Sequence, residues 1–198
     1  MYLYGASGHG KVVAEIAEEN GYIIENYIDK DPLKKLLLEY TVLHEVPQND
    51  IDVTISIGDN SIRKKIADEN QSFNYITLIH PKTVISKRAK IAEGTVVMPG
   101  VIINSEVTVG KHCIINTNAS IDHDCEIGDY VHISPGASLA GNVLVGQGTH
   151  IGIGASIIQG VKIGKWSVIG AGAVIIREVP DGATVVGNPG RIIKITES

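Results

Sequence analysis

From residue 85 onward, an aliphatic side chain recurs at every sixth position of the chain. The sixteen positions that run in steps of six from Ile85 to Ile175 all carry Ile, Val or Leu, and Ile79 continues the register backwards. The residue two places before each of them, from Thr83 to Ala173, is small or β-branched. A period of six with one large and one small inward residue is typical of a hexapeptide parallel β-helix.

In such a β-helix each hexad forms one flat side, and three sides make one coil. Residues 18 apart in the sequence therefore lie on one line, one coil above the other, about 4.8 Å apart. The aliphatic side chain fills the interior, and the small residue lies where the wall comes close. The position after the aliphatic often holds a turn former, as at Asn104, Gly110 and Asp122, and we expect the turn there.

Residues 1–78 have a different pattern, that of a small α/β unit. The expected elements are a strand at 2–4, a helix that ends near 20–21, strands at 22–28 and 53–57, a helix through 62–67 and an extended segment at 75–79, with 33–46 unassigned. The first strand runs into the glycine turn Gly5–Gly10, and Asp29 follows the second strand. A helix N-terminus after a glycine turn binds phosphate, and a carboxylate after the second strand binds ribose hydroxyls.

The glycine turn alone does not establish a nucleotide site, because a tight strand–helix turn needs glycine without any ligand. A dinucleotide site needs two mononucleotide-binding halves, and about 78 residues provide one. These residues therefore suit a nucleoside diphosphate better than NAD.

Composition supports the β-rich interpretation and excludes several functions. The chain has 31 Ile and 20 Val, only 5% aromatic residues and a net charge of −5, which argues against nucleic-acid binding. No run approaches 18 apolar residues and the start lacks a leader pattern, so we expect no membrane association. Cys113 and Cys125 occupy small inward positions. We expect them to be buried fillers in a cytoplasmic protein.

Polar residues that could carry chemistry interrupt the repetitive wall at few places. They are Asp122-His123-Asp124, His132 and His150, and none of them is in an inward position. The spacing of 18 places His132 beside His150, and Gly141 beside His123. A carboxylate that holds one nitrogen of a histidine makes the other a better general base. A glycine N–H can stabilise a developing oxyanion. The alternative for His123 is a surface histidine in a polar turn.

Metal binding is a further alternative, since hexapeptide β-helices include carbonic anhydrases with three histidines at subunit interfaces. Their paired ligands sit on neighbouring turns at short spacing. Here His112, His123, His132 and His150 are separated by 11, 9 and 18 residues. We therefore expect no metal.

Four segments, taken in order, resemble one family. They are Gly5–Gly10, Ile57–Lys64, His123–Ala137 and Val186–Pro189. The family is the nucleotide-sugar N-acetyltransferases that include the UDP-4-amino-sugar acetyltransferase of bacillosamine synthesis, with their relatives, the sialic acid O-acetyltransferases. The resemblance covers essentially the whole chain. It implies a Rossmann-like nucleotide-sugar-binding domain at 1–78, a left-handed parallel β-helix acetyltransferase domain with a C-terminal tail at 79–198, and a homotrimer.

The resemblance also implies roles for individual residues. His123 would be the general base for the sugar amino group, and Asp124 would hold and polarise it. The residues implied to bind acetyl-CoA are His132, Gly141, Gly152, Ile153, Gly170 and Ala171, with the Gly141 amide facing the thioester carbonyl. Those implied to bind the nucleotide end of the substrate are Ser7, Gly8, His9, Asp29 and Gly58.

The resulting prediction is an enzyme of glycan biosynthesis that moves acetyl from acetyl-CoA to the 4-amino group of a UDP-linked amino-deoxy sugar, by direct attack without an acyl-enzyme. An O-acetyltransferase acting on sialic acid is the alternative, because a hydroxyl and an amine both need a base and an acyl donor. A non-catalytic scaffold or nucleotide-sensing module and a metal-dependent lyase are alternatives of other classes. The bacillosamine enzyme has a second acidic residue directly after the position of Asp29, where this chain has Lys30. The base is therefore open among uracil, guanine and thymine.

Overall fold

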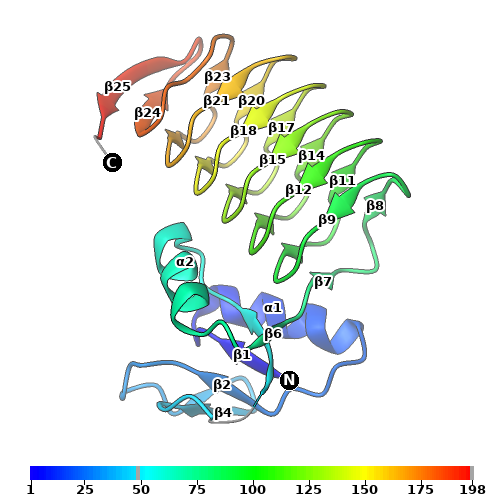
Figure 1. Ribbon diagram of the computed structural model, residues 1–198, viewed down its shortest axis with the longest axis vertical. Helices are drawn as coiled ribbons and strands as arrows, with labels where there is room; N and C mark the ends of the chain where they lie inside the picture. The colour runs from blue at the N-terminus through cyan, green and yellow to red at the C-terminus, as the bar shows by residue number, and fades with distance from the viewer. Residues whose placement is uncertain (48–49, 197–198) are drawn as a thin grey trace.

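A computed structural model describes residues 1–47 and 50–196 of the chain. An α/β head forms one end of the molecule, and a parallel β-helix extends from it to the C-terminus (Figure 1). Neither helix found in the described residues has the length and apolar character needed to cross a bilayer.

The head is built on a sheet whose strands have the order β3-β4-β2-β1-β5-β6. Its elements are β1 (Tyr2–Tyr4), α1 (Gly8–Glu19), β2 (Asn26–Ile28), β3 (Leu36–Leu37), β4 (Tyr40–Leu43), β5 (Asp52–Ile55), α2 (Asn60–Glu69) and β6 (Asn74–Tyr75). The central strand β1 pairs in parallel with β2 on one side and β5 on the other. The chain order reverses at β1, and in open α/β sheets ligands bind beside the carboxyl ends of the strands at such a point.

Most head elements agree with the pattern of the sequence, but three segments differ. β2 begins at Asn26 rather than at residue 22, because its partner β1 begins only at Tyr2, which pairs with Asn26. The unassigned residues 33–46 contain the antiparallel pair β3–β4. The segment at 75–79 is divided between β6, in the head sheet, and β7 (Leu78–Ile79), the first strand of the β-helix.

Three parallel sheets form the sides of the β-helix. The first contains β7, β10 (Val96–Val97), β13 (Ile114–Ile115), β16 (His132–Ile133), β19 (His150–Ile151), β22 (Val168–Ile169) and the closing hairpin β24 (Ala183–Val186) and β25 (Arg191–Ile195). The second contains β8 (Val84–Ile85), β11 (Ile102–Ile103), β14 (Ser120–Ile121), β17 (Ser138–Leu139), β20 (Ser156–Ile157) and β23 (Val174–Ile175). The third contains β9 (Lys90–Ile91), β12 (Thr108–Val109), β15 (Glu126–Ile127), β18 (Leu144–Val145) and β21 (Lys162–Ile163).

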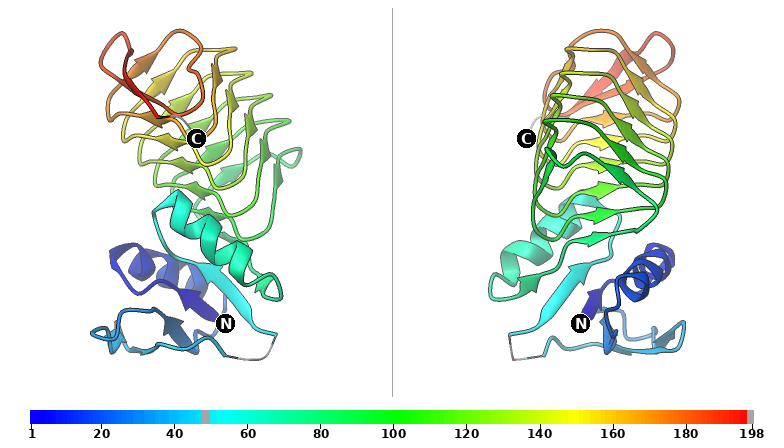
Figure 2. Two further views of the ribbon diagram at one scale, coloured as in Figure 1. Left: turned by 60° about the vertical axis from the view of Figure 1, so that its left-hand side comes forward. Right: turned by 90° about the vertical axis from the view of Figure 1, so that its right-hand side faces the viewer.

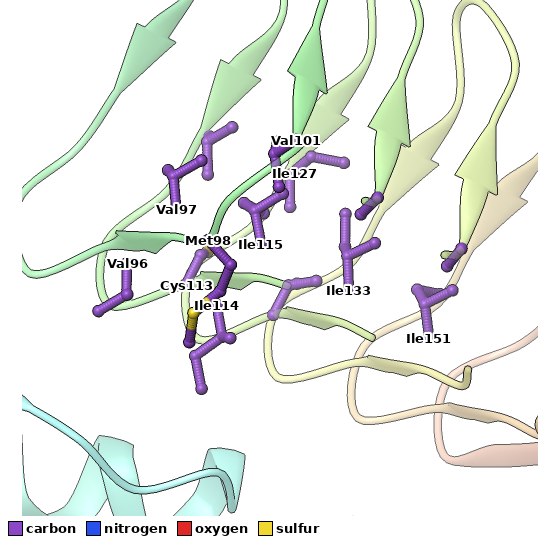
Figure 3. Packing of buried hydrophobic residues seen from close by; sticks show 14 of the residues in the cluster. Val96, Val97, Met98, Val101, Cys113, Ile114, Ile115, Ile127, Ile133 and Ile151 are labelled. Carbon is purple, nitrogen blue, oxygen red and sulfur yellow. The ribbon is translucent and has the colours of Figure 1, made fainter. Parts of the chain in front are cut away.

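The interior is filled by the aliphatic series that the sequence predicts. Val97, Ile115, Ile133 and Ile151 follow one another in register, and all four are fully buried (Figure 3). The small inward positions are also filled as expected, and the cysteines at two of them are free and buried. The period of six therefore sets both the register and the core.

The corners differ from the prediction, which placed the turn one residue after each aliphatic. The left-handed residue lies two places further on, as at Glu106 (φ 61°) and Asp124 (φ 59°). Glycine after the aliphatic has another cause, the close approach of the next coil. A Cβ added to Gly110 would lie 2.6 Å from the amide nitrogen of Asp129, and one added to Gly146 would lie 2.6 Å from that of Lys165.

The head covers the lower part of the first sheet. Leu78, Val96 and Ile114 point outward from the β-helix on one line, yet each is fully buried. They belong to one hydrophobic cluster that also contains Leu3 and Ile16 of the head. Both helices lie on the side of the head that faces the coils (Figures 1 and 2). The head and the β-helix therefore share a core.

Candidate active site

His123 and Asp124 lie together on the corner between β14 and β15. The Nδ1 atom of His123 is 2.7 Å from Oδ2 of Asp124. Oδ1 of Asp122 accepts hydrogen bonds from the His123 amide and from Nδ2 of Asn104, each 2.8 Å long. The polar run that the sequence singles out is thus a hydrogen-bonded corner with an oriented imidazole.

Gly141 lies under the imidazole of His123, as the spacing of 18 predicts. A Cβ added to Gly141 would be 2.6 Å from Cε1 and 2.7 Å from Nε2 of His123. The His123 carbonyl accepts a hydrogen bond from Asn142, whereas within the described residues the Gly141 N–H has no protein acceptor. In the described part of the chain this amide is therefore an available donor at the residue against which the His123 ring packs.

The electrostatics of the corner favour a basic imidazole. The hydrogen bond that Nδ1 of His123 donates to Asp124, and then the charge of Asp122, raise the pKa of His123. The side chains of His123 and Asp124 are 59% and 58% exposed, so the pair is open to solvent and to a substrate. The arrangement can take a proton from an attacking nucleophile.

A second group of histidines lies where the head meets the first sheet. His132 and His150 pair in register, and their ring centroids are 4.8 Å apart. Oδ1 of Asn116 accepts from the Thr117 amide, so Nδ2 of Asn116 donates to Nε2 of His132 over 3.1 Å. A neutral His132 ring therefore carries its proton on Nδ1.

This group includes His132, which is predicted to bind acetyl-CoA, and residues of the head that are predicted to bind the nucleotide. Burial, and then the neighbouring His150, lower the pKa of His132 to about 3, while the backbone of Gly58 acts in the opposite direction. Burial, and then Arg63, lower the pKa of His9 to about 4. Within the described residues, Nδ1 of His132 and Nε2 of His9 are buried without a hydrogen-bond partner. Both rings are neutral at pH 7 and present unused polar atoms.

The predicted nucleotide residues lie at the carboxyl edge of the head sheet. Ser7 precedes α1, and its side chain makes no capping hydrogen bond. Oδ2 of Asp29 accepts from the Ala6 amide and from Nζ of Lys34, and Oδ1 accepts from the Asp31 amide. Burial opposes ionisation of Asp29, but these hydrogen bonds outweigh it and keep its pKa below the usual range. Asp29 thus fixes the glycine turn to the loop after β2.

The remaining predicted residues occupy two stacked corners above the histidine group. A Cβ added to Gly152 would lie 2.7 Å from the amide nitrogen of Ala171 and 2.7 Å from the carbonyl carbon of Gly170. Ile153 is 61% exposed although it is a large aliphatic residue. These corners form an open apolar ledge.

Sequence reasoning did not identify Arg63 and Asn60, which join the head to the β-helix. Arg63 of α2 is 1% exposed and donates to the carbonyls of Ile57, Gly58, His112 and Tyr130. Asn60 accepts from Arg63 and donates to the carbonyl of Gly148. A helical arginine looks like a surface residue in sequence. The signal in the sequence that could have revealed a covered face of the β-helix is the line of apolar residues, Ile114 among them, that point outward from the first sheet.

The histidines do not converge as metal ligands. Within residues 1–47 and 50–196, no group of three or more His, Cys, Asp or Glu side chains is arranged to hold a metal ion. The His123–Asp124 pair and Gly141 lie on the corner between the second and third sheets, whereas His132 and His150 lie in the first sheet, so one protomer does not bring the two groups together.

Comparison with known families matches both parts of the chain. Residues 1–70 match the family described as PglD N-terminal domain. Residues 106–141 and 142–177 match the family described as bacterial transferase hexapeptide (six repeats).

Solved structures resemble the chain over nearly its whole length. One is PerB from Caulobacter crescentus in complex with CoA and GDP-perosamine, with 35% identity, 98% of this chain and 96% of that chain covered, and a TM-score of 0.93. Another is the acetyltransferase domain of PglB from Neisseria gonorrhoeae in complex with acetyl coenzyme A, with 36% identity, 97% and 98% covered, and a TM-score of 0.89.

A curated relative is UDP-N-acetylbacillosamine N-acetyltransferase from Bacillus subtilis. It is 41% identical over 110 residues, which are 48% of this chain and 49% of the relative, so the match spans about half of its length. The matches confirm the predicted fold class, an α/β head followed by a left-handed β-helix. The chain therefore belongs to the family of hexapeptide-repeat sugar N-acetyltransferases that carry a PglD-type N-terminal domain.

Proposed function

We propose that the protein transfers the acetyl group of acetyl-CoA to the 4-amino group of a nucleotide-activated amino-deoxy sugar. The observation that carries this proposal is the His123–Asp124 pair, whose imidazole packs against Gly141, a residue whose amide has no acceptor within the described residues. The relatives add support, since PerB was crystallised with CoA and GDP-perosamine, and the Bacillus subtilis protein is named as a UDP-N-acetylbacillosamine N-acetyltransferase.

The proposed reaction is one direct displacement. The sugar amine attacks the thioester carbonyl carbon, and Nε2 of His123 takes the proton that the nitrogen loses. The developing oxyanion accepts a hydrogen bond from the Gly141 amide. The C–S bond then breaks, and the protonated His123 returns its Nε2 proton to the CoA thiolate as it leaves, which regenerates the free imidazole. Proximity, base and amide donor together lower the barrier, so no acyl-enzyme is needed.

The two substrates approach from different sides of the corner. In the proposed arrangement His132, Gly152, Ile153, Gly170 and Ala171 bind acetyl-CoA. The nucleotide end binds the head through the α1 amides at Gly8 and His9, with Ser7, Asp29 and Gly58 around them. His9 and the backbone of Gly58 both affect the pKa of His132, which supports a continuous path from the head to the β-helix.

We further propose that the protein acts as a homotrimer in the cytoplasm. His123 at 59% side-chain exposure and Ile153 at 61% exposure lie on open corners, and a neighbouring subunit would supply the second wall of the cleft. The free thiols of Cys113 and Cys125 are consistent with a reducing compartment.

The test is CoA-thiol release from acetyl-CoA with a panel of acceptors. The panel contains UDP-, GDP- and dTDP-linked 4-amino-4,6-dideoxy sugars and a sialic acid, and His123→Ala is assayed alongside. Turnover on an amino sugar that is lost in the variant supports the proposal. Turnover only on the sialic acid would replace it with O-acetylation. If acetyl-CoA does not bind at all, the chain is a scaffold or sensor instead.

A further inference from the structure

A pocket of about 290 Å³ opens at the carboxyl edge of the head sheet. It lies between β1, the loops after β2 and β5, and the exposed side of α2. Its lining residues are Tyr4, Gly5, Asp29, Lys30, Ile57, Ile62, Lys65, Ile66 and Glu69. The roles proposed above use only Asp29 from this set, so the pocket is otherwise unassigned.

The position of the pocket fits the base of a bound nucleotide, an argument that rests on the proposed function. Gly5 begins the glycine turn that leads to the α1 amides, and Asp29 follows β2. A nucleotide with its phosphates at α1 and its ribose near Asp29 would direct its base away from α1, toward α2. The pocket lies on that path, at the point where the strand order reverses.

The walls of the pocket suit a flat ring. Tyr4, Ile57 and Ile66 provide apolar surface, and a Cβ added to Gly5 would lie 2.4 Å from Cγ1 of Ile57, so the floor is closely packed. Ile62 also lines the pocket and is 48% exposed. A base in the pocket would cover Ile62 and remove its apolar surface from water.

Three charged side chains at the pocket form a bridged row. Nζ of Lys30 lies 3.5 Å from Oε2 of Glu69, and Nζ of Lys65 lies 3.8 Å from Oε1 of the same carboxylate. Lys30 comes from the loop after β2, whereas Lys65 and Glu69 are one turn apart on α2. The row therefore offers a donor, an acceptor and a donor in that order.

This order matches one class of base. Uracil and thymine present O2, N3–H and O4, which are an acceptor, a donor and an acceptor. Guanine presents an acceptor and two donors, so its 2-amino group would face a lysine ammonium. Cytosine presents two acceptors and a donor, and its N3 would face the Glu69 carboxylate. We propose that Lys30, Glu69 and Lys65 select a nucleotide whose base carries the imide edge shared by uracil and thymine.

Nucleoside diphosphate binding to the intact protein tests this proposal without requiring catalysis. Calorimetry with UDP, dTDP, GDP and CDP should give UDP and dTDP dissociation constants about tenfold or more below those of GDP and CDP, because a mismatched base leaves a polar group unpaired. The ratio of the UDP and dTDP affinities then shows whether the pocket prefers uracil or thymine.

The variant Glu69→Gln should weaken UDP binding about tenfold and leave GDP binding unchanged, so that the preference is lost. Asp68→Asn is the matched control, since Asp68 forms the same i,i+4 pair with Lys64 one residue earlier on α2. It should keep the wild-type preference. Thermal unfolding of both variants checks that the head remains folded.

Two outcomes would overturn the inference alone. They are GDP binding as tightly as UDP, and a uridine preference that survives in Glu69→Gln. In either case acetyl transfer to an amino sugar would leave the proposed function intact. If no nucleoside diphosphate binds while acetyl-CoA does, the nucleotide part of the proposed function fails, and the inference fails with it.

Discussion

The imidazole of His123 is held by its own sequence neighbour, with Nδ1 of His123 2.7 Å from Oδ2 of Asp124. Asp124 has a left-handed backbone (φ 59°), and the sharp corner brings the two adjacent side chains together. The pair is exposed. The pKa of His123 is therefore raised by the hydrogen bond to Asp124 and the nearby charge of Asp122 rather than by burial.

Removal of the imidazole should abolish most turnover. We expect His123→Ala to lower kcat about 10²-fold or more, the usual contribution of a general base, with little effect on substrate KM. Steady-state assays of CoA-thiol release measure both quantities. His80→Ala, at the first corner of the β-helix, serves as the control histidine and should leave kcat unchanged. A kcat for His123→Ala equal to wild type would remove His123 from the mechanism.

Asp124→Asn should shift the pH dependence of the reaction. The wild-type kcat/KM should rise with pH through the raised pKa of His123, since the free imidazole is the active form. Loss of the carboxylate lowers that pKa toward 6.5, so the acidic limb should move to lower pH and the plateau should fall about tenfold or more. Asparagine tolerates the left-handed backbone at this position, which protects the fold. Both profiles use the same substrate, so any titration of the substrate contributes equally to the two. An acidic limb at the same pH in wild type and Asp124→Asn would contradict the role of Asp124.

Gly141→Ala should act through the imidazole above it. Its Cβ would lie 2.6 Å from Cε1 of His123, so the ring must move, and displacement of a catalytic group by about 1 Å can cost about 10²-fold in rate. The double variant Gly141→Ala/His123→Ala tests the mechanism of this loss. It should be no slower than His123→Ala alone if the methyl group acts only by displacing the ring. Additive losses would show a separate role for the Gly141 amide.

The sequence period predicted more of this site than its motifs did. A step of 18 placed Gly141 beside His123 and His132 beside His150, and both neighbours lie where expected. Each coil repeats the backbone of the last, so register along the β-helix is a local property. The influence of His9 and of the Gly58 backbone on the pKa of His132 was not predicted, because the way the head packs on the β-helix depends on tertiary contacts without a period.

The buried Arg63 is a second case in which a tertiary contact could not be predicted from the sequence. Arg63 occupies a polar position on a short helix, where a charged residue normally faces solvent. Besides the Asn60 side chain, its hydrogen-bond acceptors are carbonyls of Ile57, Gly58, His112 and Tyr130, which have no side-chain signature in the sequence. In the sequence, only the apolar outward residues of the first sheet could have indicated that something covers that face.

Arg63→Met should destabilise the whole protein strongly. Burial lowers the pKa of Arg63 only to about 10, so the guanidinium is charged at pH 7. It donates hydrogen bonds to carbonyls of both the head and the β-helix. Loss of these bonds leaves buried carbonyls unpaired, and we expect the free energy of unfolding to fall by about 3 kcal/mol or more. Urea denaturation measures the change. Lys64→Met, one residue along α2 and partly exposed, should change stability by less than about 0.5 kcal/mol.

Acid should destabilise the contact between the head and the β-helix through its neutral histidines. Burial is the main cause that lowers the pKa of His9 and His112 to about 4, and that of His132 to about 3, whereas an unfolded chain restores 6.5. Between these values the unfolded state binds more protons than the folded state. Stability is therefore fully present above pH 6.5 and is lost as pH falls below it, by up to about 1.4 kcal/mol per pH unit for each group.

Urea denaturation at steps between pH 7.5 and about pH 5 measures this slope. His112→Asn should reduce this slope by about the contribution of one buried histidine, because His112 is 3% exposed. Asparagine accepts the left-handed backbone of this position (φ 53°), so the fold should be kept. The exposed His123 has a raised pKa, so its small contribution has the opposite sign. Lys and Arg charges do not change in this range, and protonation of carboxylates is largely complete only at lower pH. Stability that stays constant from pH 7 to 5, or a His112→Asn slope equal to that of wild type, would show that these histidines are not buried in the folded protein.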